Sequence, residues 1–138
     1  MKPNIGIADK NLKAVADILN TLLADEVTLY IKTRQAHWNY EGDNFMEMHK
    51  FFESQYEQLD EIMDEVAERV RMLGHYSVGS LKDFTKLARL TEAKTSSSNQ
   101  NTAVASLLND HETIIRAVRT EVADTNDKYK DVGTADFL

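Results

Sequence analysis

The sequence of 138 residues contains no cysteine, a single proline and five glycines. The lack of cysteine excludes disulfides, thiolate catalysis and sulfur-ligated metals. So few helix-breaking residues leave long uninterrupted segments, which favours an all-α fold. No apolar run approaches the roughly twenty residues that cross a bilayer, and the N-terminus lacks the apolar core of a signal peptide. We therefore expect a single domain over residues 1–138, located in the cytoplasm and without a membrane partner.

The formal net charge of the chain is −7. Such a charge opposes tight nonspecific binding to nucleic acid unless basic residues are gathered in one place. Before the first expected helix the basic residues are Lys2 and Lys10, which is not a basic arm. Any metal chemistry in a chain without cysteine must use nitrogen and oxygen ligands.

Apolar residues at helical spacing predict three long helices. The first is expected to start near Asp9 or Asn11 and to end near Trp38, and the others cover 45–73 and 102–127, with Gly74 as a stop signal for the second. Asp43 or Asn44 is expected to cap the second helix after a short turn. The inner face expected for the third helix consists of Val104, Leu108, His111, Ile115, Val118 and Val122.

Two shorter elements accompany the long helices. Ser80 followed by Asp83 resembles a capping box and predicts a short helix ending near Leu90, before a polar loop over 93–100. Residues 134–138 resemble the first turn of a further helix, so we expect the chain to be truncated in its fourth bundle helix after Leu138. Three long helices alone leave an apolar groove where a fourth would pack.

Two pairs of metal-capable side chains lie on the second helix with i,i+4 spacing. His49 and Glu53 lie near its start, and Asp64 and Glu68 near its end. Glu53 and Asp64 are separated by roughly 16 Å along the helix axis, so the pairs cannot share an ion within one chain. Both pairs are symmetric about the peptide between residues 58 and 59. A second, antiparallel copy of the helix would therefore place each acidic pair opposite the partner's His–Glu pair, forming two identical sites.

His37 is expected to join this site from the first helix. His37 and His49 are each six residues from Asp43, so a tight hairpin places them opposite each other. Mixed histidine and carboxylate ligation suits Fe(II), and zinc or manganese can substitute for it. No histidine has a glutamate three residues before it, and this argues against the in-bundle Glu-x-x-His site of ferritins.

The segments 36–39 and 64–69, together with His49 and Glu53, resemble the signature of Dps-type mini-ferritins, the DNA-binding proteins from starved cells. The resemblance implies a ferritin-like four-helix bundle with a short extra helix between the second and third bundle helices. It also implies a hollow homo-dodecamer that oxidises Fe(II), preferably with hydrogen peroxide, and stores the ferric mineral. The family often has aspartate where this chain has Glu53.

Carried over residue by residue, the resemblance implies a ferroxidase site at which Fe(II) is oxidised to Fe(III). A di-iron centre is one form that this site can take. Its catalytic and metal-binding residues are His37, His49, Glu53, Asp64 and Glu68. The resemblance further implies iron-entry pores with the acidic candidates Asp127, Asp131 and Asp136. Trp38 adjoins His37 and is a candidate electron relay.

Each of these signals has a simpler interpretation. His49 alone is typical of a hydrogen-bonded core histidine, and Asp64 with Glu68 is typical of a solvated helix face. Trp38 can be a residue packed at a helix end, His111 is interpreted as structural, and His75 as an exposed loop residue. The alternative functions are a DNA-coating protein with secondary iron binding and an inert helical scaffold. With a net charge of −7 and no basic arm, we expect DNA binding to be weak.

Overall fold

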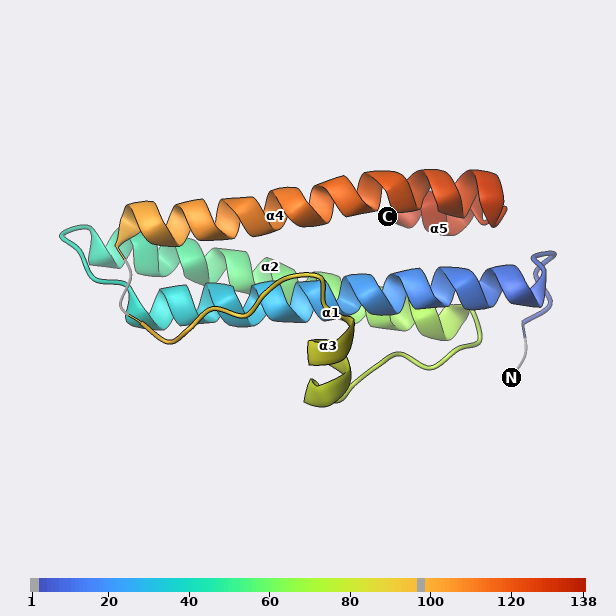
Figure 1. The fold of residues 1–138 in the computed structure, drawn as a ribbon, viewed down its shortest axis with the longest axis horizontal. Helices are drawn as coiled ribbons and strands as arrows, with labels where there is room; N and C mark the ends of the chain where they lie inside the picture. Colours follow the sequence, from blue (N-terminus) through green and yellow to red (C-terminus); the bar gives the residue numbers. More distant parts are fainter. Residues whose placement is uncertain (1–2, 97–98) are drawn as a thin grey trace.

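The computed structural model describes residues 3–96 and 99–138, and its three long helices form the body of the molecule (Figure 1). Helix α1 spans Asp9–Asn39, α2 spans Phe45–Met72 and α4 spans Gln100–Ala123. The short helices α3 (Leu81–Leu87) and α5 (Val132–Phe137) complete the order, with a π-helical turn η1 (Asp124–Lys128) between α4 and α5. The predicted all-α fold is confirmed, and the predicted helix starts agree with the observed ones within about two residues.

The hairpin of α1 and α2 forms the largest packed unit. The two helices run antiparallel, and their facing apolar residues form the core. A sharp stop ends α2, because Gly74 has a φ of +82° and the amides of Gly74 and His75 bond to the carbonyls of Arg71 and Val70. The predicted stop at Gly74 is therefore confirmed. Asn44 is the N-cap of α2 as expected, but its side chain makes no capping hydrogen bond.

The connection between α2 and α4 must run back along the bundle, because these two helices point in the same direction (Figure 1). Helix α3 lies on this connection and packs against α1. Ser80 caps it, since its hydroxyl accepts a hydrogen bond from the amide of Asp83 at 3.1 Å, as the capping box predicts. The helix ends at Leu87 rather than near Leu90. Residues 93–96 of the predicted loop are irregular, while Ser97 and Ser98, like Lys2, lie outside the described residues.

The predicted inner face of α4 is wrong by about one residue at several positions. Its buried residues are Ala103, Leu107, Asp110 and Ile114, which pack toward α1. Val104, Leu108 and Ile115 are instead partly exposed and line a groove between α4 and α2. The expected apolar groove is thus present. The sequence pattern did not distinguish the face of α4 that packs on α1 from the neighbouring apolar face that borders the groove.

A buried aspartate holds the long connection against α1. The carboxylate of Asp25 accepts hydrogen bonds from the amide and Nε of Arg89, both at 2.6 Å, and from the amide of Leu90 at 3.2 Å. Arg89 also pairs with Glu121 at 2.5 Å, so one guanidinium links α1, the connection and α4. Burial alone lowers the pKa of Arg89, but the Asp25 hydrogen bond and the charge of Glu121 outweigh it and raise that pKa overall. Among the described residues, none of the helices is long and apolar enough to cross a membrane.

Replacing Asp25 with alanine should lower the free energy of unfolding by about 3–5 kcal/mol, because it leaves Arg89 and two amides without their buried acceptor. The matched control is Asp17→Ala on the same helix, whose pair with Lys13 is exposed and should contribute less than about 1 kcal/mol. Urea denaturation at equal protein concentration measures both. Equal losses in the two variants would contradict the assigned role of Asp25.

Candidate metal centre

Two histidines face each other where α1 ends and α2 begins. The rings of His37 and His49 stack with centroids 3.6 Å apart and planes 19° from parallel. Nδ1 of His37 lies 2.8 Å from the carbonyl oxygen of His49, and Nδ1 of His49 lies 3.0 Å from the carbonyl oxygen of His37. The predicted juxtaposition of these two histidines is therefore confirmed.

The paired carbonyls fix the tautomer of both rings. A carbonyl oxygen can only accept, so each Nδ1 must carry the hydrogen and donate it. In the neutral ring this leaves the lone pair of Nε2 free, which is the form in which imidazole binds a metal. The two imidazoles are thus oriented as metal ligands by the main chain of the opposite helix.

Aromatic neighbours restrict the movement of the histidine pair. The ring of Phe45 stacks on His49 with centroids 5.0 Å apart, and the ring of Tyr56 meets His37 edge-on at 5.2 Å. The hydroxyl of Tyr56 also donates to Oε1 of Glu53 over 3.4 Å. Desolvation, and after it the charge of Glu53, raises the pKa of Tyr56, which therefore remains a neutral phenol. Tyr56 thereby connects His37 with Glu53, one turn beyond His49 on the same helix.

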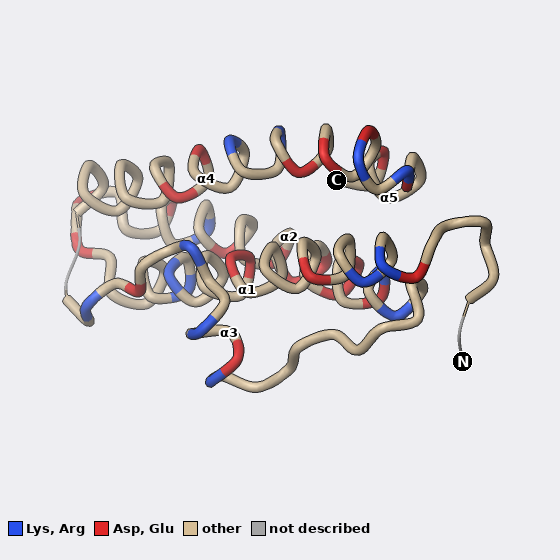
Figure 2. Tube along the Cα trace, turned by 45° about the vertical axis from the view of Figure 1, so that its right-hand side comes forward, with Lys and Arg blue, Asp and Glu red and all other residues tan. Residues whose placement is uncertain are grey.

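The other two predicted ligands lie at the far end of α2. Asp64 and Glu68 are exposed, as are Glu57 and Asp60 between them and the histidine end. Because α2 is one continuous helix, Glu53 and Asp64 remain roughly 16 Å apart along its axis. Figure 2 shows acidic positions recurring along α2. Over residues 3–96 and 99–138 of a single chain, no three histidine or acidic side chains converge as a metal site.

The three acidic pore candidates have different surroundings. Asp127 in η1 and Asp136 in α5 are exposed. Asp131 is buried and caps α5, since its Oδ1 accepts from the amide of Thr134 at 3.0 Å and its Oδ2 from the Thr134 hydroxyl at 2.6 Å. Nε of Arg69 donates to that hydroxyl at 3.0 Å. The pore role stays a prediction, and for Asp131 it competes with an internal structural role.

Three further side chains from the sequence analysis can be placed. Trp38 is 60% exposed, and its ring lies against the guanidinium of Arg34 at 5.3 Å, so it is not packed into the helix end. His111 is half-buried beside Phe51 and Phe52 in the groove, and burial lowers its pKa. His75 is partly exposed, and its carbonyl accepts from Arg71.

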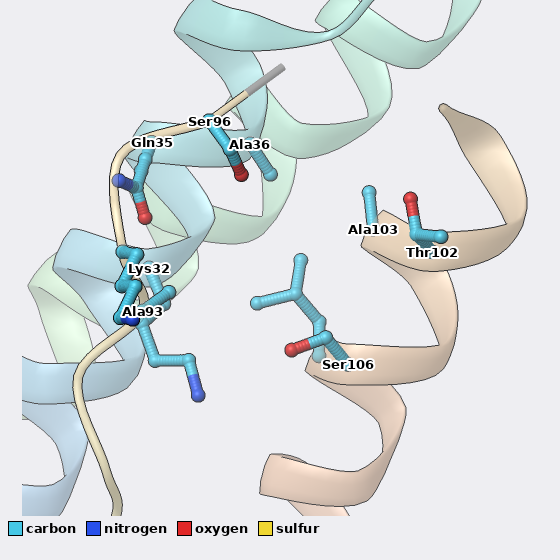
Figure 3. Close-up of a pocket in the computed structure, with 10 residues that line it drawn as sticks. Lys32, Gln35, Ala36, Ala93, Ser96, Thr102, Ala103 and Ser106 are labelled. Carbon is cyan, nitrogen blue, oxygen red and sulfur yellow. The ribbon is translucent and has the colours of Figure 1, made fainter. Parts of the chain in front are cut away.

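A separate pocket of about 300 Å³ lies between α1, residues 93–96 and the first turns of α4 (Figure 3). It contains the amine of Lys32, which pairs with Asp110 at 2.5 Å and donates to the carbonyl of Thr91 at 3.0 Å. Apart from Lys32 and Lys94, its lining is uncharged. The pocket therefore offers no carboxylate or imidazole ligands, and the histidine pair remains the candidate metal centre.

Among the buried acids that the sequence did not reveal, Glu26 borders the groove between α2 and α4. Glu26 is 7% exposed, and its Oε2 has no hydrogen-bond partner. Burial, and after it the charge of Asp25, raises the pKa of Glu26 from 4.5 to about 7. The available signal was an acidic residue on the apolar stripe of the first helix, between Leu23 and Leu29.

Replacing Glu26 with glutamine should increase stability relative to wild type as the pH rises. Because its pKa in the folded state lies above the unfolded value of 4.5, this carboxyl contributes stability below pH 4.5 that is lost as the pH rises through about 7. Urea denaturation at pH 5 and pH 8 should show Glu26→Gln gaining up to ~3 kcal/mol over wild type between the two. The exposed Glu65 borders the same groove, and Glu65→Gln should show no such gain.

Comparisons with known proteins agree on one family. The model of the ferritin-like domain matches residues 16–138. A DNA protection during starvation protein of Helicobacter pylori is 31% identical, over 88% of this chain and 83% of its own length. The chain is a Dps-type mini-ferritin.

An uncharacterized low temperature-induced protein of Nostoc is 42% identical over 98% of this chain and 75% of its own length. The crystal structure of the Dps protein of Vibrio cholerae O1 superposes on this chain with a TM-score of 0.90 and 29% sequence identity. The match covers 98% of this chain and 84% of the Vibrio chain, which is described as a member of a broad superfamily of ferritin-like diiron-carboxylate proteins.

Membership of the Dps family accounts for the arrangement already described. The short α3 occupies the connection between the second and third long helices, as the sequence resemblance implied. The ferritin-like fold prediction is confirmed. The five ligands predicted for this mini-ferritin stay a prediction. Within one chain the rings of His37 and His49 are stacked, and Tyr56 contacts both His37 and Glu53.

Proposed function

We propose that this mini-ferritin is a cytoplasmic ferroxidase that oxidises Fe(II), preferably with hydrogen peroxide, and stores the ferric mineral inside a hollow dodecamer. The observation that carries the proposal is the His37–His49 pair, whose Nδ1 atoms are both bound to main-chain carbonyls and whose Nε2 atoms are free. Two imidazoles oriented in this way, with the Glu53 carboxylate one turn beyond His49 on α2, suit Fe(II), and zinc or manganese can substitute. The family membership supports the same chemistry.

Each proposed site is completed by a second subunit. One chain contributes His37, His49 and Glu53, and its two-fold partner contributes the residues equivalent to Asp64 and Glu68. The exposed acidic face of α2 supports this arrangement, because an antiparallel copy centred on the peptide between residues 58 and 59 sets each acidic pair against the other chain's histidines. A dimer of this kind has two identical sites and is the building unit of the proposed dodecamer.

Paired Fe(II) ions at one site explain the preference for peroxide. Two Fe(II) ions supply the two electrons that reduce hydrogen peroxide, with two protons, to two waters. The one-electron route, which releases a hydroxyl radical, is thereby avoided. The proposed ligands are neutral imidazoles and anionic carboxylates, which compensate the additional positive charge of Fe(III). We propose Asp127 and Asp136, both exposed, as the better candidates for an iron-entry pore.

Replacing both His37 and His49 with alanine should slow iron oxidation at least about tenfold, because loss of even an outer-shell partner typically costs 10–100-fold. The measurement is the rise of ferric absorbance after peroxide is added to protein loaded anaerobically with Fe(II). His75→Ala, which removes a histidine outside the site, is the control and should retain wild-type rates. Wild-type rates in the double variant would refute the proposed site.

Mixing two inactive variants tests whether the site is shared. His37→Ala/His49→Ala and Asp64→Ala/Glu68→Ala should each be inactive alone, since each damages both sites of its dimer. Co-expressed at equal levels, random pairing should restore about a quarter of the sites, because every mixed dimer contains one site with all wild-type ligands. A site located within one subunit predicts no recovery.

DNA protection is a second candidate function, and the names of the Helicobacter and Brevibacillus relatives favour it. The net charge of −7 argues against it. We expect no retardation of plasmid DNA on a gel near physiological salt. Strong, salt-dependent retardation would reverse the order of the two proposals.

A further inference from the structure

The pocket of about 300 Å³ between α1 and the first turns of α4 is lined by two cations and, among the described residues, by no acid. Its charged residues are Lys32 on α1 and Lys94 on the connection between α2 and α4. Figure 3 shows Lys32 on one side of the pocket and Thr102 and Ser106 of α4 on the other. In a chain whose net charge is −7, such a lining favours an anionic ligand.

The ammonium group of Lys32 has one hydrogen-bond donor to spare inside the protein. Its side chain is only 10% exposed and pairs with Oδ2 of Asp110 at 2.5 Å. It also donates to the carbonyl oxygen of Thr91 at 3.0 Å. An ammonium group has three N–H donors, so within the described part of the chain the third has no acceptor. A buried donor without an acceptor costs free energy, and an anion in the pocket supplies the missing acceptor.

Two further side chains bring donors to the pocket from other segments. Lys94 and Ser106 are both exposed, and neither has a hydrogen-bond or ion-pair partner within residues 3–96 and 99–138. The amides of Thr102 and Ala103 are not available, because both already donate to Asn99, at 3.1 and 3.0 Å. The donors are therefore side chains from three segments of the chain, and the start of α4 does not provide them.

We propose that this pocket binds a phosphate group through Lys32, Lys94 and Ser106. A tetrahedral oxyanion presents oxygens in several directions, so it can accept from α1, the connection and α4 at once. A carboxylate presents two oxygens in one plane and can meet fewer of these donors. Lysine is a common phosphate ligand, and hydrogen bonds between an ammonium group and an anionic oxygen are stronger than neutral ones.

The size of the pocket allows two sources for the phosphate group. A volume of about 300 Å³ lies at the lower end of the range for small-molecule sites, which is roughly 300–1,000 Å³. The group can therefore belong to inorganic phosphate or to a small phosphate monoester. None of the three proposed phosphate ligands is among the five proposed iron ligands, so this site does not depend on the ferroxidase function.

The test measures binding of inorganic phosphate to the assembled protein by isothermal titration calorimetry. A chelator first removes metal, so that phosphate cannot bind to iron, and sodium chloride keeps the ionic strength constant. Wild type should bind about one phosphate per chain. Lys94→Met should weaken binding at least about tenfold, because it removes a charged donor, and Ser106→Ala about threefold, because it removes a neutral one.

Lys32 requires a paired substitution. Lys32→Met alone leaves Asp110 buried without its cation and can prevent folding. Lys32→Met/Asp110→Asn removes both charges together and should abolish phosphate binding, with the helix content checked by circular dichroism. The single variants at the exposed residues 94 and 106 test the same site without disturbing this buried pair.

Lys86 provides the matched control, because it is an exposed lysine of α3 that does not line the pocket. Lys86→Met should bind phosphate as wild type does. The absence of saturable binding in wild type overturns the proposal. Binding that is unchanged in Lys94→Met and Ser106→Ala, or that Lys86→Met weakens as much as Lys94→Met does, also overturns it.

A second titration identifies the source of the phosphate group. Ribose 5-phosphate that binds more tightly than inorganic phosphate, and loses that binding in Lys94→Met, supports a small phosphate monoester as the ligand. Inorganic phosphate that binds at least as tightly as the ester supports the free ion.

Discussion

Two reciprocal hydrogen bonds close the end of the α1–α2 hairpin, with each imidazole of the His37–His49 pair donating to the main-chain carbonyl of the other residue. The contact joins the last turn of α1 to the second turn of α2, so it fixes their relative register. It also determines which ring nitrogen remains available. The candidate metal centre, its aromatic surroundings and the contact of Tyr56 with His37 all depend on this one arrangement.

Much of this hairpin could be predicted from the sequence, because its determinants are local. The equal distance of both histidines from Asp43, the stop at Gly74 and the capping residue Ser80 each act within a few residues of the chain. Local rules of this kind do not depend on the path of distant segments. The proposed contribution of Asp64 and Glu68 also came from spacing alone, but it concerns a second chain and therefore stays a prediction.

The features that escaped prediction depend on contacts between distant segments. Asp25 accepts hydrogen bonds from residues 89 and 90, more than sixty positions away, and nothing in the local pattern indicates where the connection will cross α1. The inner face of α4 was displaced because two apolar faces, one packed on α1 and one bordering the groove, overlap in the sequence. The capping role of Asp131 similarly depends on η1, whose π-helical turn shifts the residues that follow it.

The use of Nδ1 in the hairpin closure separates the stability of the fold from the occupancy of the site. Each ring uses its Nδ1 hydrogen to bond a main-chain carbonyl, so the closure of the hairpin makes no use of Nε2. In the proposed ferroxidase, iron bound at Nε2 would therefore break neither hydrogen bond, and the end of the hairpin would have the same closure with the site loaded or empty.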